Sequence, residues 1–347
     1  MKTDIRNINT SDLEKAVLSY GQPSFRAKQI IEWIWKKGNV NFSEMKNLPA
    51  ELRIKLDLDF EFKPAAEKEI QNSADGTSKI LFNLYDGNSV EGVIISMSDR
   101  VTACISTQAG CPLKCGFCAT GHYGYVRNLD AGEIYDQFVI LNRISLRSTG
   151  KPLTNLVLMG MGEPFLNLDN VLRAMEIISS PKYLNFSASR ITISTIGIPQ
   201  KINELTREKF PYKLALSLHS SIPEVRKKLI PASVKYPLEE LRKSLVNFSK
   251  KSKNHITVEF LLLKGVNTSE EEADSLVKFC SVFSSKINLI VYNEVPGLPY
   301  MRPDDDEVAR FLAFLKRKNF VVTIRKSMGR DISAACGQLA NKSKLVN

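Results

Sequence analysis

From residue 101 onward, short apolar runs alternate with longer segments of helical periodicity, and few folds accommodate this alternation. Apolar runs bounded by turn residues predict buried strands, and the 3.6-residue periodicity between them predicts helices. Buried strands joined by helices form a parallel sheet that helices cover. The predicted strands are Val101–Ser106, Asn155–Met159, Arg190–Ser194, Lys213–Leu218, Ile256–Leu263, Ile287–Tyr292 and Phe320–Arg325. The predicted helices include 131–146, 168–179, 237–251, 268–283 and 305–318. The pattern alone does not distinguish an open, doubly wound sheet from a barrel.

The preceding residues follow different patterns. Helical periodicity dominates residues 1–77, where Ser11–Glu14 has the form of a capping box and Ser24 begins a second helix. Residues 78–98 change to two apolar runs around Asp86–Asn88, which is typical of a β-hairpin with an Asp-Gly turn. We therefore predict a helical accessory domain (1–77), a linking β-hairpin (78–98) and an α/β core (99–347).

Charge is distributed unevenly along the 347 residues. The net charge is +11, but residues 1–80 hold 13 Lys and Arg against 12 Asp and Glu, so almost all of the excess follows them. Such an excess favours a polyanion such as RNA, although it equally suits a solvated basic surface. The N-terminus has no signal-peptide pattern, and no apolar run approaches the roughly 20 residues of a membrane helix. We expect a cytoplasmic protein that does not associate with membranes.

The unusual residues of the core follow the predicted strands. In parallel sheets and barrels, the carboxyl ends of the strands meet at one edge, where sites are built. One convergent pocket would therefore gather all of them. They are Cys111, Cys115 and Cys118 after the first strand, Gly160–Pro164 after the second, Ser194 and Thr195 at the third, Ser217–Ser220 at the fourth, Asn293 after the sixth and Cys336 after the seventh.

Three of the six cysteines lie within eight residues, as Cys111, Cys115 and Cys118. This spacing suits soft-metal ligation better than disulfides. Three thiolates could hold an iron–sulfur cluster with one iron left open. They could also bind zinc, with His122 as the fourth ligand.

The spacing Cys-x₃-Cys-x₂-Cys resembles the signature of radical S-adenosylmethionine (SAM) enzymes. In that superfamily the open iron of a [4Fe-4S] cluster is chelated by SAM. The superfamily's Gly-Gly-Glu-Pro element corresponds here to Met161–Pro164, with Met161 in place of the first glycine. The resemblance makes Gly162 and Glu163 SAM-binding residues.

Further motifs narrow the resemblance to the bacterial dual-specificity 23S rRNA and tRNA adenine C2-methyltransferases. The resemblance covers nearly the whole chain. It implies an incomplete parallel (β/α) barrel with a helical RNA-binding accessory domain, one [4Fe-4S] cluster, two SAM molecules per turnover, and methylation of adenine 2503 of 23S rRNA and adenine 37 of tRNAs. It also implies an electron donor such as flavodoxin or ferredoxin and a monomeric enzyme. The motifs are Gln108–Cys111, Cys118–Gly121, Arg127–Leu129, Met159–Pro164, Ser194–Gly197, Leu216–Ser220 and Asp331–Leu339.

The resemblance also assigns roles to individual residues. Cys336 would carry the methyl group, Cys104 would resolve a covalent adduct, and Glu91 would accept the C2 proton. Without the resemblance, the residues favour a core thiol for Cys104 and a solvent-facing carboxylate for Glu91. The implied SAM contacts are Ser194, Ser217, Leu218, His219 and Asn293.

Two other functions remain open at this point. A closely related group methylates the C8 carbon of the same rRNA adenine and confers antibiotic resistance. From another class, the chain could be a non-catalytic RNA-binding module that holds zinc or an iron–sulfur cluster.

Overall fold

The computed structural model describes residues 2–207, 210–252 and 254–339. Within them, one sheet of ten strands has the order β14-β13-β12-β11-β10-β9-β6-β5-β4-β3. The seven strands predicted in the core all form and pair in parallel. They are β6 (Val101–Cys104), β9 (Asn155–Leu158), β10 (Ile191–Thr195), β11 (Lys213–Ser217), β12 (Ile256–Leu262), β13 (Ser285–Val291) and β14 (Val322–Arg325).

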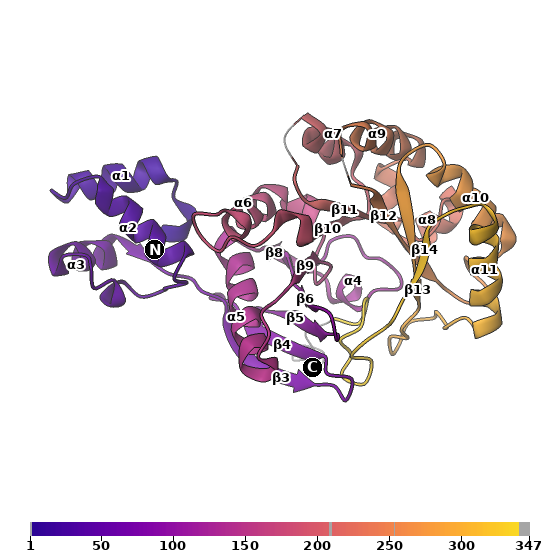
Figure 1. The fold of residues 1–347 in the computed structure, drawn as a ribbon, viewed down its shortest axis with the longest axis horizontal. Coiled ribbons are helices and arrows are strands. Elements are labelled where there is room, and N and C mark those ends of the chain that lie inside the picture. The colour runs from indigo at the N-terminus through magenta and orange to yellow at the C-terminus, as the bar shows by residue number, and fades with distance from the viewer. Residues whose placement is uncertain (1, 208–209, 253, 340–347) are drawn as a thin grey trace.

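The parallel strands neighbour one another in chain order, and the sheet curves without closing (Figure 1). A doubly wound sheet would reverse its strand order at a switch point, which this sheet does not do across the described residues. The fold is therefore an incomplete (β/α) barrel, as the resemblance implied. All seven strands direct their carboxyl ends to the same edge.

Helices cover the outside of the barrel (Figure 1). α5 illustrates why they start where they do: Asp130 and Glu133 form a capping box, and Gly150 ends the helix with a left-handed φ of 69°. The helices of the core are α4 (Ala119–Tyr123), α5 (Ala131–Thr149), α6 (Leu168–Ser179), α7 (Pro199–Arg207), α8 (Pro223–Leu229), α9 (Leu238–Lys251), α10 (Glu270–Cys280) and α11 (Asp305–Arg317). Short 3-10 helices are η3 (Pro164–Asn167), η4 (Ala188–Arg190) and η5 (Pro231–Lys235).

The N-terminal helices form a separate group beside α5 and α6 (Figure 1). The predicted capping box at Ser11 is wrong, because Asn9 caps the first helix by accepting a hydrogen bond from the Asp12 backbone at 2.8 Å. A buried ion network attaches the group to the barrel: Arg6 pairs with Asp4 at 2.9 Å and with Asp136 of α5 at 2.8 Å. The elements are β1 (Thr3–Asp4), η1 (Ile5–Asn7), α1 (Thr10–Ser19), α2 (Phe25–Trp35), η2 (Phe42–Glu44), α3 (Ala50–Asp59) and β2 (Phe60–Glu61).

Three antiparallel strands, rather than a two-stranded hairpin, extend the barrel sheet. The hairpin of β4 (Ser78–Asn83) and β5 (Ser89–Ser96) is confirmed, but β3 (Ala66–Asn72) pairs with β4 as well. The helical part of the chain therefore ends at Asp59 rather than at residue 77. The sequence did not reveal β3 because its residues are mostly polar or charged and exposed, as is common in an edge strand protected against aggregation.

A small second sheet closes the loop that carries the cysteine triplet. β7 (Gln108–Gly110) pairs with β8 (Tyr125–Asn128), and neither was predicted. Gly110 has a φ of 76°, and a Cβ there would lie 1.8 Å from the Gly124 carbonyl oxygen, so only glycine allows this close approach.

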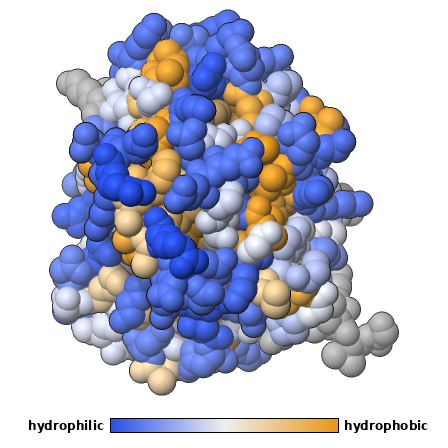
Figure 2. Space-filling model, turned by 90° about the vertical axis from the view of Figure 1, so that its right-hand side faces the viewer, coloured by the Kyte–Doolittle hydropathy of each residue, from blue (hydrophilic) through white to orange (hydrophobic). Residues whose placement is uncertain are grey.

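The face of the barrel seen in Figure 2 is mostly hydrophilic, with hydrophobic residues in separate groups. Among the described residues, no helix combines the length and the apolar character that crossing a membrane requires.

Candidate active site

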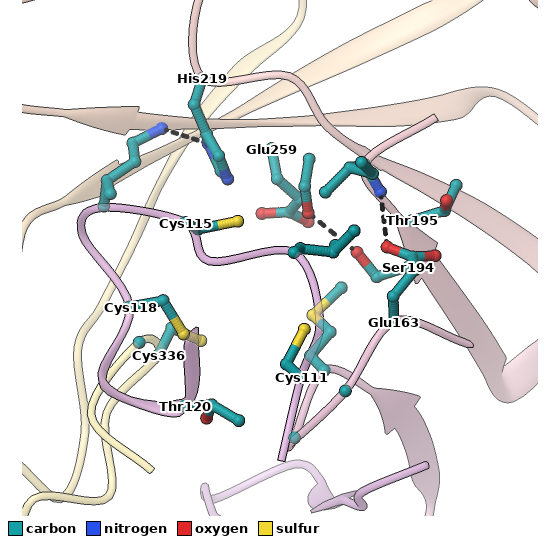
Figure 3. A pocket seen from close by; sticks show the side chains of 18 of the residues that line it. Cys111, Cys115, Cys118, Thr120, Glu163, Ser194, Thr195, His219, Glu259 and Cys336 are labelled. Atoms are coloured by element: carbon teal, nitrogen blue, oxygen red, sulfur yellow. Dashed lines mark hydrogen bonds between the residues drawn. The ribbon is translucent and has the colours of Figure 1, made fainter. Parts of the chain in front are cut away.

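A cavity opens at the carboxyl ends of the strands, where the sequence predicted a common pocket. Side chains from β9 to β14 and from the cysteine loop face it (Figure 3). Of the predicted site residues, nine line this cavity: Cys111, Cys115, Cys118, Gly162, Glu163, Ser194, Ser217, His219 and Cys336.

The cysteine loop is held in place by its own backbone. The Cys111 amide donates to the Gly124 carbonyl at 2.9 Å, and the Gly116 amide donates to the Leu229 carbonyl of α8 at 2.9 Å. Gly121 is required, because a Cβ there would lie 2.9 Å from the Cys115 backbone nitrogen. Burial raises the pKa of all three thiols, so a bound cation is needed to keep them as thiolates.

The zinc alternative finds no support in this geometry. His122 is exposed and its Nε2 lies 3.3 Å from the Gly116 carbonyl oxygen, outside the cavity lining. In the described ranges, no three His, Cys, Asp or Glu side chains are placed to hold a single metal ion. Three thiols around one cavity suit a cluster, in which each cysteine binds a different iron.

The Gly-Glu-Pro segment packs against the strand end of β6. The Met161 amide donates to Ser106 Oγ at 2.8 Å and its carbonyl accepts from the Thr107 amide at 2.8 Å, so methionine is accommodated through backbone contacts. Gly162 has a φ of 101°, and a Cβ there would lie 2.6 Å from Gln108 Cβ. Glu163 accepts backbone hydrogen bonds from Phe165 at 3.0 Å and Ile196 at 2.9 Å.

Burial raises the pKa of Glu163 to about 7, although these hydrogen bonds lower it. Glu163 is thus a carboxyl group held in a fixed position at the cavity wall. A cationic ligand would stabilise its charged form. The amino group of SAM is such a cation.

His219 faces the cavity as a neutral hydrogen-bond donor. Its Nδ1 accepts from the Leu261 amide at 3.1 Å, and burial lowers the pKa of the imidazole to about 3 with help from the charge of Arg226. The proton therefore resides on Nε2. The hydroxyls of Ser194 and Ser217 lie 3.2 Å apart on adjacent strands. The side chain of Leu218 is buried in the core and does not line the cavity.

A second cavity adjoins the first and contains two of the predicted catalytic residues. Cys336 lines both cavities, whereas Cys104 and Asn293 line the second. Burial raises the pKa of Cys104 to about 12. Asn293 is 1% exposed, and neither atom of its amide has a hydrogen-bond partner among the described residues. A buried amide of this kind can bond a ligand or an ordered water.

Glu91 lies outside both cavity linings, on the strand that borders the second. It is 4% exposed and pairs with Lys79 at 3.4 Å, so it is not solvent-facing. Val93, two residues along β5, lines the second cavity and is the register partner of Cys104. Because alternate residues of a strand share a face, Glu91 lies on the same face as this pair.

Two charged residues of the site were not predicted. Glu259 of β12 lines the first cavity, and its Oε2 has no hydrogen-bond partner within the described part of the chain. Arg325 at the end of β14 lines both cavities, and its Nη1 lies 3.3 Å from Met159 Sδ. Alternation along a strand could have indicated which residues face inward, but not which of them lie at the level of the cavity.

The loop that carries Cys336 is fastened to the turn between β3 and β4. Asp331 accepts from Ser73 Oγ at 2.6 Å and from the Ala74 amide at 3.3 Å. The Gly329 amide donates to Asp75 Oδ2 at 2.7 Å in return. In Figure 1 the C-terminal segment accordingly runs beside the antiparallel strands.

Replacement of Asp331 by alanine is expected to slow reactions at Cys336 several-fold, because the loop loses the two hydrogen bonds that fasten it to the turn between β3 and β4. Iron content should not change, since Asp331 touches no cluster cysteine. Intact-protein mass spectrometry would follow modification of Cys336, with Asp331→Asn as the variant that retains one acceptor. Equal rates in Asp331→Ala and the unsubstituted protein would contradict this role.

Known proteins share both the sequence and the fold. Residues 105–277 match the model of the radical SAM superfamily, and residues 3–61 match the ribosomal RNA large subunit methyltransferase N-terminal domain. A protein of Chlorobium chlorochromatii named "Probable dual-specificity RNA methyltransferase RlmN" is 44% identical over 97% of this chain and 94% of its own length. The chain belongs to the RlmN family. The dual-specificity RNA methyltransferase RlmN of Solidesulfovibrio magneticus is 40% identical, over 97% of this chain and 96% of its own.

A solved structure agrees with this RlmN membership. The crystal structure of a radical SAM methyltransferase from Sphaerobacter thermophilus has a TM-score of 0.89 and 38% identity, covering 97% of this chain and 99% of that one. The protein is therefore a radical SAM RNA methyltransferase of the dual-specificity type, and its cofactors are a [4Fe-4S] cluster and SAM. The three cavity thiols, the Glu163 carboxyl and the unpaired Asn293 amide fit these two groups.

Proposed function

We propose that this RlmN-type enzyme methylates the C2 carbon of adenine 2503 in 23S rRNA and of adenine 37 in tRNAs, with Cys336 as methyl carrier and Cys104 as resolving thiol. The observation that carries the proposal is the presence of both cysteines in one cavity that adjoins the cluster cysteines. A non-catalytic metal-binding module would have no need for either thiol.

The chemistry explains why a methyl carrier is needed. C2 of adenine lies between two ring nitrogens, is electron-poor and cannot attack the methyl group of SAM. The Cys336 thiolate can, and methyl transfer leaves S-methylcysteine and S-adenosylhomocysteine. Cys111, Cys115 and Cys118 would hold the cluster, which would supply the electron for cleavage of a second SAM and so for activation of the methyl group on Cys336.

The chain's own residues complete the reaction. After the activated carbon joins C2, Glu91 accepts the C2 proton and one electron passes back to the electron-transfer partner, so that the ring regains aromaticity. The Cys104 thiolate then attacks the sulfur of Cys336 and breaks the carbon–sulfur bond. The electron pair stays on the carbon, which takes up a proton to become the methyl group, and a Cys104–Cys336 disulfide remains for external thiols to reduce.

The proposed SAM contacts come from adjacent strand ends. Gly162 and Glu163 contact the amino acid portion, and the hydroxyls of Ser194 and Ser217, the backbone at Leu218, the Nε2–H of His219 and the amide of Asn293 hold the remainder. His219 suits this role because its neutral form persists at all physiological pH values. The enzyme would act in the cytoplasm as a monomer, with flavodoxin or ferredoxin as electron donor.

The product of a defined reaction tests the function. We expect anaerobic incubation with SAM, reductant and an rRNA fragment or tRNA to give 2-methyladenosine, identified by mass spectrometry of nuclease digests against C2 and C8 standards. Detection of 8-methyladenosine would instead assign the protein to the related C8-methylating resistance enzymes. Recovery of unmodified RNA from an iron-loaded enzyme that cleaves SAM would contradict the RNA-methylating role.

A further inference from the structure

Arg226 in α8 is a buried cation without an acidic partner. Its side chain is 1% exposed, and no carboxylate in the described ranges forms an ion pair with it. The guanidinium donates instead to backbone carbonyls, those of Leu218 and Ile196 and, at 3.4 Å, that of Ser217. Its Nε has no hydrogen-bond partner among the described residues.

The carbonyl oxygens accept hydrogen bonds from the Arg226 guanidinium, but they carry no net charge that would balance it. A buried ion without a counter-charge costs several kcal/mol, and proteins normally pair it or coordinate it. Burial lowers the pKa of Arg226 to about 10, which leaves the group protonated at neutral pH. The arrangement therefore lacks one negative charge.

The cysteine loop is where that charge would lie. Arg226 donates to the carbonyls of Ile196 and Ser217, and both of these residues line the first cavity together with Cys115. α8 also contacts the loop directly, through the Gly116 amide and the Leu229 carbonyl at 2.9 Å. Three thiolates around an oxidised [4Fe-4S] core with charge +2 give a net charge of −1, and reduction makes it −2.

We propose that Arg226 is the buried counter-cation of the iron–sulfur cluster and raises its reduction potential. A fixed positive charge stabilises the reduced, more negative cluster more than the oxidised one, and the shielding of this site from water strengthens the effect. The same guanidinium fixes the carbonyls that end β10 and β11, so the strand ends with Ser194 and Ser217 keep their place beside the cluster. The proposal rests on family membership for the cluster and not on the identity of the methylated carbon.

The test separates the charge of Arg226 from its shape. Arg226→Lys keeps the charge, whereas Arg226→Gln and Arg226→Met remove it. Lys228→Met is the matched control, because Lys228 is an exposed cation of the same helix. The readout is the cluster potential in the anaerobically reconstituted full-length protein, from a redox titration followed by electron paramagnetic resonance.

We expect the Gln and Met variants to hold at least tenfold less reduced cluster at a given potential, a shift of at least about 59 mV to more negative values. Arg226→Lys and Lys228→Met should stay close to the unsubstituted protein. Unchanged potentials in the Gln and Met variants would overturn the proposal, as would an equal shift in Arg226→Lys. If the neutral variants do not retain iron, retention by Arg226→Lys alone supports the proposal, and loss from all three overturns it.

Discussion

Cys104→Ala protein is expected to remain covalently attached to its RNA. Methyl transfer to Cys336 does not need Cys104, so the carbon link to adenine should still form. The thiol that would attack the Cys336 sulfur is missing, and no other cysteine lines the second cavity in the described residues. Turnover should therefore stop at about one RNA per protein, and a denaturing gel would show a protein band shifted by the mass of the RNA.

Cys336→Ala should fail differently. Without the methyl carrier neither methylated RNA nor the covalent adduct can form, although reductive cleavage of SAM can continue. Mass spectrometry of digested adducts from the Cys104→Ala protein should place the RNA on Cys336. Cys280→Ala is the matched control, because this thiol is buried in α10 and lines neither cavity.

Two results would exclude the methyl-cysteine route. One is normal turnover in Cys104→Ala, and the other is methylated adenine from Cys336→Ala. An adduct that forms equally in Cys280→Ala and Cys104→Ala would also show that Cys104 has no special role in its release.

Cys115→Ala should abolish both the cluster and the activity. Loss of outer-shell partners alone commonly lowers metal affinity by roughly 10- to 100-fold, and loss of a direct ligand from a set of three should cost more. We expect less than about a hundredth of the activity, together with loss of iron, sulfide and the oxygen-sensitive visible absorbance of the anaerobically purified protein.

His122→Ala is the control for the cluster, since zinc ligation would require this imidazole and an iron–sulfur cluster would not. It should retain both iron and activity. Stoichiometric zinc without iron in an active, anaerobically prepared protein would contradict the cluster, and so would an active Cys115→Ala variant.

Much of the barrel could be predicted from the sequence because its signals are local. The seven parallel strands coincide with apolar-rich segments, and α6 spans Leu168–Ser179, matching the predicted range. The short elements were missed where local signals are weak. β3 is polar or charged along most of its length, and β7 and β8 are held together by the close approach that Gly110 permits rather than by any apolar pattern.

The candidate site divides in the same way. The cysteine spacing and the Gly-Glu-Pro segment were visible because such chemistry needs fixed residue types at short separations. Glu259, Arg325 and Arg226 were not visible, since an isolated charged residue in a strand or helix is ordinarily exposed. These three residues contribute to the site because they are buried. Sequence periodicity does not show whether a single polar residue is buried.

By itself, the sequence determined the order of most strands and helices, the three cluster cysteines and the placement of most proposed site residues near a strand end. The tertiary structure alone decided that Cys104 and Cys336, separated by more than 200 residues, line one cavity, and that the turn after β3 fastens the Cys336 loop. It also decided that Arg226 is buried without an acidic partner among the described residues. Local sequence patterns indicate which secondary structure a segment forms and which of its faces is buried. The contacts between segments that are distant in the sequence depend instead on how the packed sheet curves.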